Sequence, residues 1–117
     1  LAHGSSHTAL VKSKMDKWHS RLNGETLAVF GCGKHTEWLF DHFETHPLFS
    51  DRPIIFLDEC RCGSEYRGRP VTHPEDISDL QVVLLSSDTF WKDMKRTIET
   101  SFPNASILNF YEGTDND

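Results

Sequence analysis

The stretch Leu27-Ala28-Val29-Phe30-Gly31-Cys32-Gly33-Lys34-His35-Thr36-Glu37 decides the fold of this chain. Its first four residues are continuously apolar, which is typical of a short strand buried on both faces. Two glycines follow, and the apolar positions after them recur with the period of a helix. The stretch therefore predicts a strand that turns directly into a helix, whose first backbone amides would point at an anion.

The glycine turn has the pattern Gly31-x-Gly33-x-x-Thr36, which departs from the dinucleotide-binding fingerprint at its third glycine. The first glycine permits a tight turn, and the second lets a phosphate approach the backbone closely. Because Thr36 adds a side chain, we expect a wider helix–strand spacing or a local hydrogen bond from its hydroxyl. The alternative is a purely structural turn without a ligand. The candidate ligand-binding residues of the turn are Gly31, Cys32, Gly33, Lys34, His35 and Thr36.

Hydrophobic periodicity divides the rest of the chain into helices and strands. Apolar residues three or four apart predict helices over 6–22, 34–46 and 90–102. Continuous apolar runs predict strands over 26–30, 53–57, 81–85 and 105–110. Pro47 is expected to end the second helix. The apolar stripe of the first helix is Val11, Met15, Trp18 and Leu22, and that of the last is Phe90, Met94, Ile98 and Phe102.

The connection between the second and third strands carries weaker signals. Residues 60–69 are polar and are expected to form a loop, whose basic cluster 66–70 would reach a diphosphate or a sugar, or would simply be solvated. Pro70-Val71 is expected to form a minimal edge strand. In the segment 72–75 we expect a capped helix start, in which the Thr72 side chain accepts from the Glu75 amide.

Strands alternate with helices along the chain, and this order predicts a parallel sheet covered on both faces. We therefore expect an α/β fold: a three-layer Rossmann-like parallel sheet of four main strands plus a short edge strand, with helices on both faces. Residues 8–111 would form one domain. A disordered or expression-derived tail would precede it over 1–7, and an acidic tail would follow over 112–117. Because the chain starts with Leu1, we expect an excerpt or a processed product.

Polar residues follow two of the predicted strands at the edge where parallel strands end together. Asp58 could accept both hydroxyls of a ribose and would repel a 2′-phosphate, or it could cap the following turn. Ser86 and Ser87 could touch a ribose or a phosphate, or serve as ordinary helix caps, a role that we expect of Asp88. Glu59 is expected to point away, because side chains alternate along a strand.

Three cysteines and several histidines offer other chemistry. Cys32, Cys60 and Cys62 could join His35 at a zinc ion, but their spacing matches no common zinc site, and we expect no metal. A pair of Cys32 with Cys60, or an activated Cys32 thiol at the helix N-terminus, are further alternatives. Unremarkable cysteines are favoured. Four other histidines are expected in exposed or tail positions, namely His42 and His46 on the helix surface and His3 and His7 in the tail.

Composition limits the classes of function. The chain has 117 residues, enough for one domain, and its net charge of −6 argues against nucleic-acid binding. No apolar run approaches the ~20 residues of a membrane span. An odd number of cysteines and the lack of a recognisable signal peptide indicate a cytoplasmic location.

Four motifs together resemble a group of Rossmann-like domains with a Gly-x-Gly-x-His-Ser/Thr turn. Such domains occur at the N-terminus of bacterial sugar acyltransferases, where they hold the nucleotide-sugar, and at the C-terminus of sugar C-methyltransferases. The resemblance implies that Gly31, Gly33, His35 and Thr36 line the phosphate side of a pocket, with Asp58 and Ser86 at its floor. The motifs are 29–36, 55–59, 68–75 and 84–88.

The chain lacks the hexapeptide repeats of the acyltransferases and any methyltransferase half, so the resemblance leaves a binding module. We expect it to bind a nucleotide, a nucleotide-sugar or a dinucleotide such as NAD(H), as part of, or partner to, a sugar-modifying protein. A homodimer through exposed aromatic side chains is a further expectation. The alternative is a ligand-free structural or interaction domain. A small enzyme using Cys32 or His35 is a third option.

Overall fold

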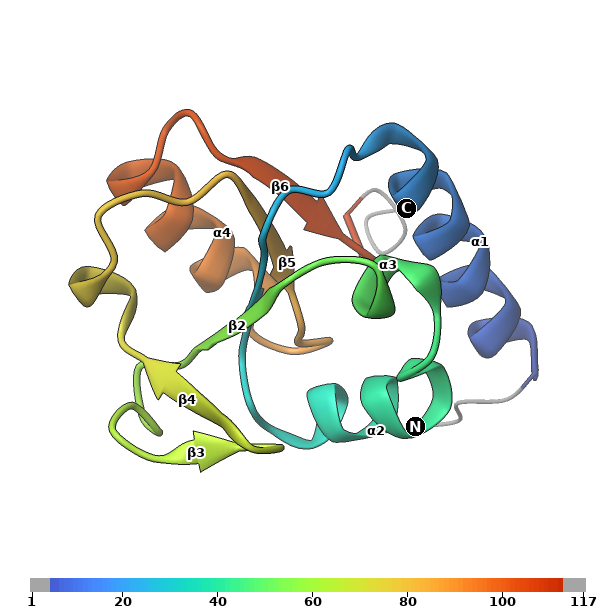
Figure 1. Ribbon diagram of the computed structural model, residues 1–117, viewed down its shortest axis with the longest axis horizontal. Helices are drawn as coiled ribbons and strands as arrows, with labels where there is room; N and C mark the ends of the chain where they lie inside the picture. The colour runs from blue at the N-terminus through green and yellow to red at the C-terminus, as the bar shows by residue number, and fades with distance from the viewer. Residues whose placement is uncertain (1–4, 113–117) are drawn as a thin grey trace.

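A computed structural model describes residues 5–112 and shows one sheet with helices packed against it (Figure 1). Within these residues the sheet has six strands, in the order β3-β4-β2-β1-β5-β6. The elements are α1 (Ser5–Arg21), β1 (Leu27–Phe30), α2 (Lys34–Phe43), α3 (Pro47–Ser50), β2 (Ile54–Leu57), β3 (Glu65–Tyr66), β4 (Arg69–Thr72), the 3-10 helix η1 (Pro74–Asp76), β5 (Val82–Leu85), α4 (Trp91–Ser101) and β6 (Ser106–Asn109).

The centre of the sheet is parallel, as the alternation of elements predicted. β1 pairs with β2 on one side and with β5 on the other, and the register places Phe30 beside Leu57 and Leu85. β4 and β6 extend the parallel pairing outward. All four residues of β1 and of β5 are buried, which explains their unbroken apolar sequences.

The expectation of four main strands and one short edge strand is wrong. Residues 60–69, expected to be a loop, contain β3, which pairs antiparallel with β4 as a small hairpin. β4 is also longer than the two residues expected, because it pairs with β2 on its other side. This hairpin gave no sequence signal, since a two-residue strand is too short to show an alternating pattern.

One face of the sheet is covered by α1, α2 and α3. Apolar side chains of these helices pack on strand residues whose side chains point to the same face of the sheet, among them Val29, Phe56 and Leu84. The predicted stripe of α1 is confirmed, because Val11 and Met15 are fully buried. The helix expected over 34–46 is shorter. α2 ends at Phe43, and Pro47 does not merely stop it but begins α3, since proline fits the first turn of a helix.

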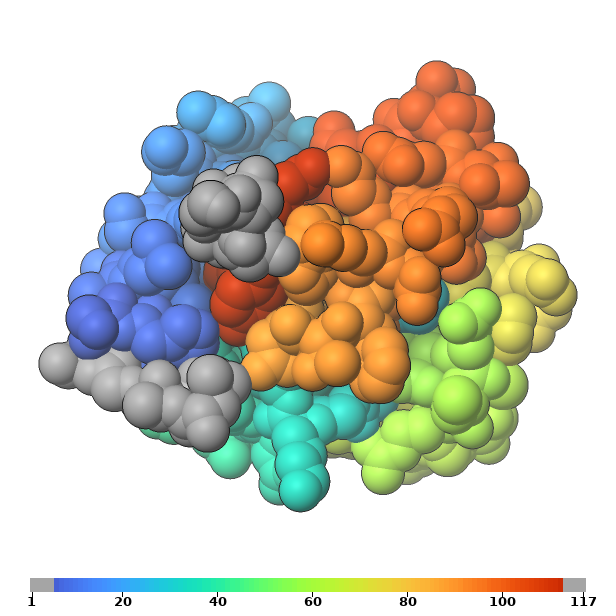
Figure 2. Space-filling view, turned by 180° about the vertical axis from the view of Figure 1, so that it is seen from behind, coloured from blue at the N-terminus to red at the C-terminus, as the bar shows by residue number. Residues whose placement is uncertain are grey.

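α4 covers the other face, where Trp91 and Ile98 pack on Phe30, Val83 and Leu85. The space-filling view from behind shows the residues of this helix in orange on the surface (Figure 2). The expected helix start at 72–75 is only the single turn η1. Its cap is His73, whose Nδ1 accepts from the Glu75 amide at 3.0 Å, whereas Thr72 belongs to β4. An imidazole nitrogen thus replaces the expected hydroxyl.

A buried arginine, Arg52, ties the helices of the first face to the loop before β1. Arg52 is 7% exposed, and its Nε donates to the carbonyl of Leu48 at 2.8 Å. Its Nη2 lies 3.0 Å from Nδ1 of His19, and its Nη1 lies 3.9 Å from the carboxylate of Glu25. Because each of its nitrogens has a partner, the guanidinium can be buried without an isolated charge.

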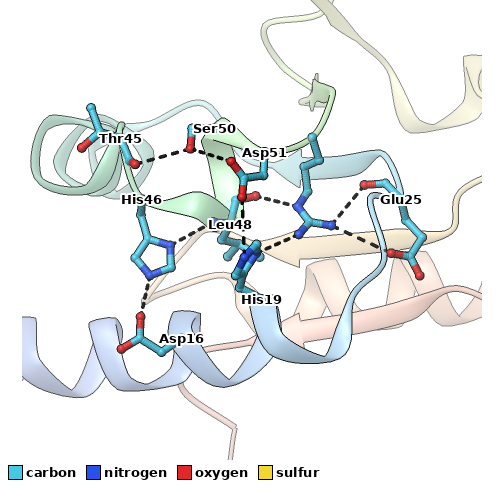
Figure 3. A network of polar contacts seen from close by, with 9 residues as sticks. Asp16, His19, Glu25, Thr45, His46, Leu48, Ser50 and Asp51 are labelled. Carbon is cyan, nitrogen blue, oxygen red and sulfur yellow. Dashed lines mark hydrogen bonds and ion pairs between the residues drawn. The ribbon is translucent and has the colours of Figure 1, made fainter.

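His46 links α3 to α1 in the same network. Its Nδ1 accepts from the Leu48 amide at 3.0 Å, and its Nε2 lies 2.7 Å from a carboxylate oxygen of Asp16 (Figure 3). Its side chain is only 8% exposed, so the expected exposed position is wrong for this histidine. His42 is exposed as expected.

The boundaries of the domain differ slightly from the expectation. α1 begins at Ser5, so residues 5–7 of the expected tail belong to a helix. Residues 1–4 and 113–117, which include His3 and most of the expected acidic tail, lie outside the described part of the chain. Within the described part of the chain, no helix has the length and apolarity of a bilayer span.

Candidate functional site

Two adjoining clefts lie at the carboxyl ends of the parallel strands. The larger has a volume of about 810 Å³ and is bordered by the segments after β1 and β2 and by the start of α4. The smaller, of about 590 Å³, lies between the segments after β1 and β5. Figure 2 shows the start of α2 (turquoise), the β2–β4 connection (light green) and α4 (orange) side by side. Both clefts are lined by Cys32, Gly33, Lys34, Asp58, Phe90 and Met94.

The two glycines of the turn differ in whether the structure requires glycine at their position. Gly31 has φ +108°, and a Cβ there would lie 2.9 Å from the backbone oxygen of Ser86. Glycine is therefore required at this position by both the dihedral angle and the space. Gly33 has φ −97°, and a Cβ there would meet nothing within 4 Å. Its free side opens on the clefts, so sterics inside the protein do not require glycine there.

The start of α2 leaves backbone donors at the edge of both clefts. The first backbone hydrogen bond of the helix runs from the Glu37 amide to the carbonyl of Gly33, at 3.1 Å. The preceding amides of the first turn have no acceptor within the helix. Lys34 is exposed, and it lines both clefts beside Gly33. The helix N-terminus thus borders both clefts, and the expectation that its amides bind an anion stays a prediction.

Asp58 holds the turn together from the end of β2. Its Oδ2 accepts from the Cys32 amide at 2.8 Å, and its Oδ1 accepts from the amides of Cys60 and Arg61 at 2.8 and 2.9 Å. A carboxylate has about four acceptor positions, so three of them are occupied by backbone amides. The geometry is that of the turn cap which the sequence left open as the alternative to ribose binding. Glu59 is exposed but also lines the larger cleft.

Arg61 is a residue of this site that the sequence reasoning missed. Its Nη1 donates to the carbonyl of Cys32, so the backbone of Cys32 is held at its N–H by Asp58 and at its carbonyl by Arg61. Arg61 also lines the larger cleft. Its position three residues after Asp58 was the available signal for a basic residue at the cleft. We expected the basic residues of 66–70 there instead.

A chain of hydrogen bonds joins the turn to the C-terminal segment. Thr36 Oγ1 lies 2.5 Å from the carbonyl oxygen of Gly31 and 2.7 Å from Ser86 Oγ. His35 places Nδ1 2.9 Å from Ser86 Oγ and Nε2 2.6 Å from the hydroxyl of Tyr111. Thr36 and Ser86 are buried. The local hydrogen bond expected for Thr36 is therefore present, and Ser86 is bonded within the protein.

The direction of donation along this chain of hydrogen bonds follows from the Gly31 carbonyl, which can only accept a hydrogen bond. Thr36 has one hydroxyl proton and gives it to that carbonyl, so Ser86 must donate to Thr36. His35 must then donate its Nδ1–H to Ser86. In a neutral imidazole the other nitrogen, Nε2, is an acceptor, and it receives the proton of the Tyr111 phenol. The arrangement selects one tautomer of His35.

Tyr111 and His7 complete the chain and were not expected at the site. Burial raises the pKa of the Tyr111 phenol, and the nearby Asp88 carboxylate raises it further, so Tyr111 remains a hydrogen-bond donor. His7 lies in α1, not in a tail, with Nε2 3.3 Å from the Tyr111 hydroxyl and its ring 5.1 Å from that of Trp38. Both residues come from the ends of the domain, where the sequence shows no motif.

The segment after β5 has a different cap from the one expected. Ser87 Oγ accepts from the amides of Thr89 and Phe90 at 3.1 and 2.7 Å, while the Asp88 carboxylate accepts only from the Thr89 hydroxyl. The expectation that Asp88 caps the helix is wrong, because the chain makes a turn around Ser87 first. Phe90, expected on the apolar stripe of the helix, is 62% exposed and lines both clefts.

The cysteines do not support an activated thiol. Cys32 is fully buried, and this burial, reinforced by the nearby Asp58 carboxylate, raises the pKa of its thiol to about 11. The alternative of an activated Cys32 is therefore wrong. Cys60 and Cys62 are exposed, and all three cysteines are free thiols, so the Cys32–Cys60 pair is not formed. Among residues 5–112 no group of three or more His, Cys, Asp or Glu side chains could hold a metal ion.

The basic cluster over 66–70 has mainly a structural role. Arg67 pairs with Asp41 of α2 at 2.6 Å, and the pair raises the pKa of the guanidinium further. The same guanidinium lies 5.7 Å from the ring centre of Phe40 and 5.8 Å from that of Tyr66. These contacts fasten the β3–β4 hairpin to α2. Tyr66 and Arg67 also form part of the wall of the larger cleft.

Comparisons of the chain with protein-family models, with curated proteins and with solved structures find no match.

Proposed function

We propose that this domain has a Rossmann-like layout and binds a nucleotide, a nucleotide-sugar or a dinucleotide across the carboxyl edge of its sheet. The ligand lies over the glycine turn, with one half in each of the two clefts. The domain acts as a binding module that serves a sugar-modifying protein, like the domains that its motifs resemble. It is not proposed to catalyse a reaction alone.

The position of the clefts in the topology carries this proposal. From β1 the chain proceeds to β2 and β4 on one side of the sheet, and then returns to β5 on the other side of β1. Ligands of open parallel sheets bind outside the carboxyl ends of the strands at such a reversal of strand order. The two clefts meet at Gly33, directly after β1, where that reversal occurs.

The chemistry of the lining suits a ligand with a phosphorylated centre and a flat, less polar end. The first amides of α2 and the side chain of Lys34 offer donors to phosphate. Phe30, Phe90 and Met94 offer an apolar surface in the larger cleft. Asp58 keeps about one acceptor position for a ribose hydroxyl after its three amide contacts.

A thermal-shift screen with NAD, UDP-sugars, coenzyme A and S-adenosylmethionine tests the proposal. A ligand present at about 100 times its dissociation constant adds about 2.7 kcal/mol to the free energy of unfolding, which such a screen detects. Gly33→Val should abolish this shift, because the new side chain occupies the space that the phosphate requires. Without ligand it should fold normally, since a Cβ at Gly33 meets nothing within 4 Å.

Thr100→Val is the matched control, because Thr100 is an exposed residue of α4 that lines neither cleft. The control should bind as the wild type does. A ligand that stabilises the wild type and Gly33→Val equally would place its binding site elsewhere.

A ligand-free structural or interaction domain is the second candidate, and one observation favours it. Asp58, Thr36 and Ser86, three of the residues expected to contact a ligand, already have hydrogen-bond partners within the protein. This candidate predicts no thermal shift with any nucleotide at millimolar concentration. It also predicts that Gly33→Val and the wild type give the same thermal-shift results in the presence of each nucleotide.

A further inference from the structure

We infer that Arg61 binds the phosphoryl group of the ligand, beside Lys34 and the first amides of α2, an inference that rests on the proposed function. The sequence did not single out Arg61, and a helix N-terminus alone does not explain anion binding here. Three observations place the phosphate contact on this side chain: the occupied amide of the turn, the fixed position of the guanidinium, and the lack of a carboxylate partner.

The first observation concerns the glycine turn itself. The amide of Cys32, the first one after Gly31, donates to the Asp58 carboxylate at 2.8 Å. This amide is not available to a ligand, and the carboxylate adds a negative charge at the turn. A phosphate that approaches the remaining amides therefore needs a cation nearby to offset Asp58.

The second observation is that Arg61 is held at both of its ends. Its backbone amide donates to Asp58 Oδ1 at 2.9 Å, and its Nη1 donates to the carbonyl of Cys32. The guanidinium thus lies against the Cys32 carbonyl, within the glycine turn. A guanidinium has five N–H donors, so this contact leaves others for the oxygens of a phosphate in the cleft.

The third observation is the difference between the two arginines of the larger cleft. Arg67 is neutralised by Asp41, at 2.6 Å. Arg61 forms no ion pair with any carboxylate in the described part of the chain, and it lines the larger cleft, where its guanidinium contacts the carbonyl of Cys32. Its charge is therefore available to a ligand, whereas the charge of Arg67 is used to fasten the hairpin.

The experiment compares a nucleoside diphosphate with its nucleoside in three proteins. Dissociation constants of UDP and uridine, and of ADP and adenosine, are measured by calorimetry for the wild type, Arg61→Gln and Arg69→Gln. Arg69 is the matched control, because it is an exposed arginine of β4 that lines neither cleft. The wild type should prefer a diphosphate over its nucleoside, and Arg61→Gln should reduce that preference at least tenfold.

Arg69→Gln should keep the preference of the wild type, and the nucleosides should bind to all three proteins alike. Arg61→Lys should recover only part of the preference, because an ammonium group lacks the planar fork of donors. All three variants change an exposed residue. Melting temperatures equal to that of the wild type, measured without ligand, confirm that each variant is folded.

The outcomes separate this inference from the proposed function. If the wild type binds a diphosphate and Gly33→Val does not, but Arg61→Gln retains the full preference, the role of Arg61 is wrong and the binding site stands. If no diphosphate binds to the wild type, the proposed function and the role of Arg61 both fail.

Discussion

The carboxylate of Asp58 accepts a hydrogen bond from the backbone amide of Cys32, with 2.8 Å between oxygen and nitrogen. This contact joins the end of β2 to the turn after β1, although the two residues are 26 positions apart. It makes one acid responsible both for the shape of the glycine turn and for the loop that carries Arg61.

Replacing Asp58 should therefore destabilise the domain even without a ligand. Asp58→Ala removes the acceptor of three amides, and we expect a loss of about 2 kcal/mol in the free energy of unfolding, measured with urea. Asp58→Asn should lose about half as much, because its amide group still has one accepting oxygen. Glu59→Ala, at the next and exposed position, should change stability by less than about 0.5 kcal/mol. Equal losses for Asp58→Ala and Glu59→Ala would contradict the bracing role.

The two glycines of the turn should respond differently to alanine. Gly31→Ala places a Cβ 2.9 Å from the Ser86 backbone oxygen at φ +108°, and we expect a loss of about 3 kcal/mol. Gly33→Ala adds a Cβ in open space at negative φ, so it should lose only the ~1 kcal/mol or less by which alanine is a poorer helix N-cap than glycine. Thermal unfolding of both variants measures the difference. A similar loss for both would mean that the turn differs from the one described.

Stability should fall at alkaline pH because of buried acidic groups. Burial raises the pKa of the Cys32 thiol to about 11, above the ~8.5 of an unfolded cysteine. The folded state then holds the proton longer than the unfolded state, so the stabilisation is complete below about pH 8.5 and is lost as the pH rises towards 11. Tyr111 contributes in the same direction above about pH 10, since its pKa is also raised.

Urea unfolding at several values between pH 8 and pH 11 measures this effect. Cys32→Ala should flatten the decline, whereas Cys62→Ala should not, because Cys62 is exposed. Parallel curves for the wild type and Cys32→Ala would contradict the role of Cys32.

The hydrogen-bond chain predicts the tautomer of His35. Because Ser86 must donate to Thr36, the neutral imidazole should carry its proton on Nδ1, and nitrogen NMR at about pH 8 distinguishes the two tautomers. Tyr111→Phe should keep this tautomer, since the Ser86 side of the ring is unchanged. Ser86→Ala should remove the preference for the Nδ1-protonated tautomer, because Nδ1 loses its acceptor. A proton found on Nε2 in the wild-type protein would show that the chain runs in another direction.

Several parts of the fold could be predicted from the sequence because they depend on neighbouring residues. The apolar run over 27–30, the stripe containing Val11 and Met15, and the stop before Pro103 are local patterns, and the elements formed where they were expected. The short β3 was missed because two residues show no period. α3 was missed because Pro47 can both end one helix and begin the next.

The site was predicted in part for the same reason. Gly31 and Gly33 could be identified because a tight turn between a strand and a helix depends on adjacent residues. Arg61 could not be assigned, because its contact with the Cys32 carbonyl depends on which strands are neighbours. The sequence also offered two roles for Asp58, and the structure shows the turn-capping one, in which its carboxylate accepts from three backbone amides.

The sequence by itself determined an α/β domain with a glycine turn between a buried strand and a helix, since periodicity and backbone sterics act over a few residues. Only the tertiary structure decided which side chains meet at that turn. The register that sets Phe30 beside Leu57 and Leu85 also brings Asp58 and Ser86 to Cys32 and Thr36, and the last residues of the domain bring Tyr111 to His35. Such contacts join residues 26 to 76 positions apart, and they exist only once the strands have paired.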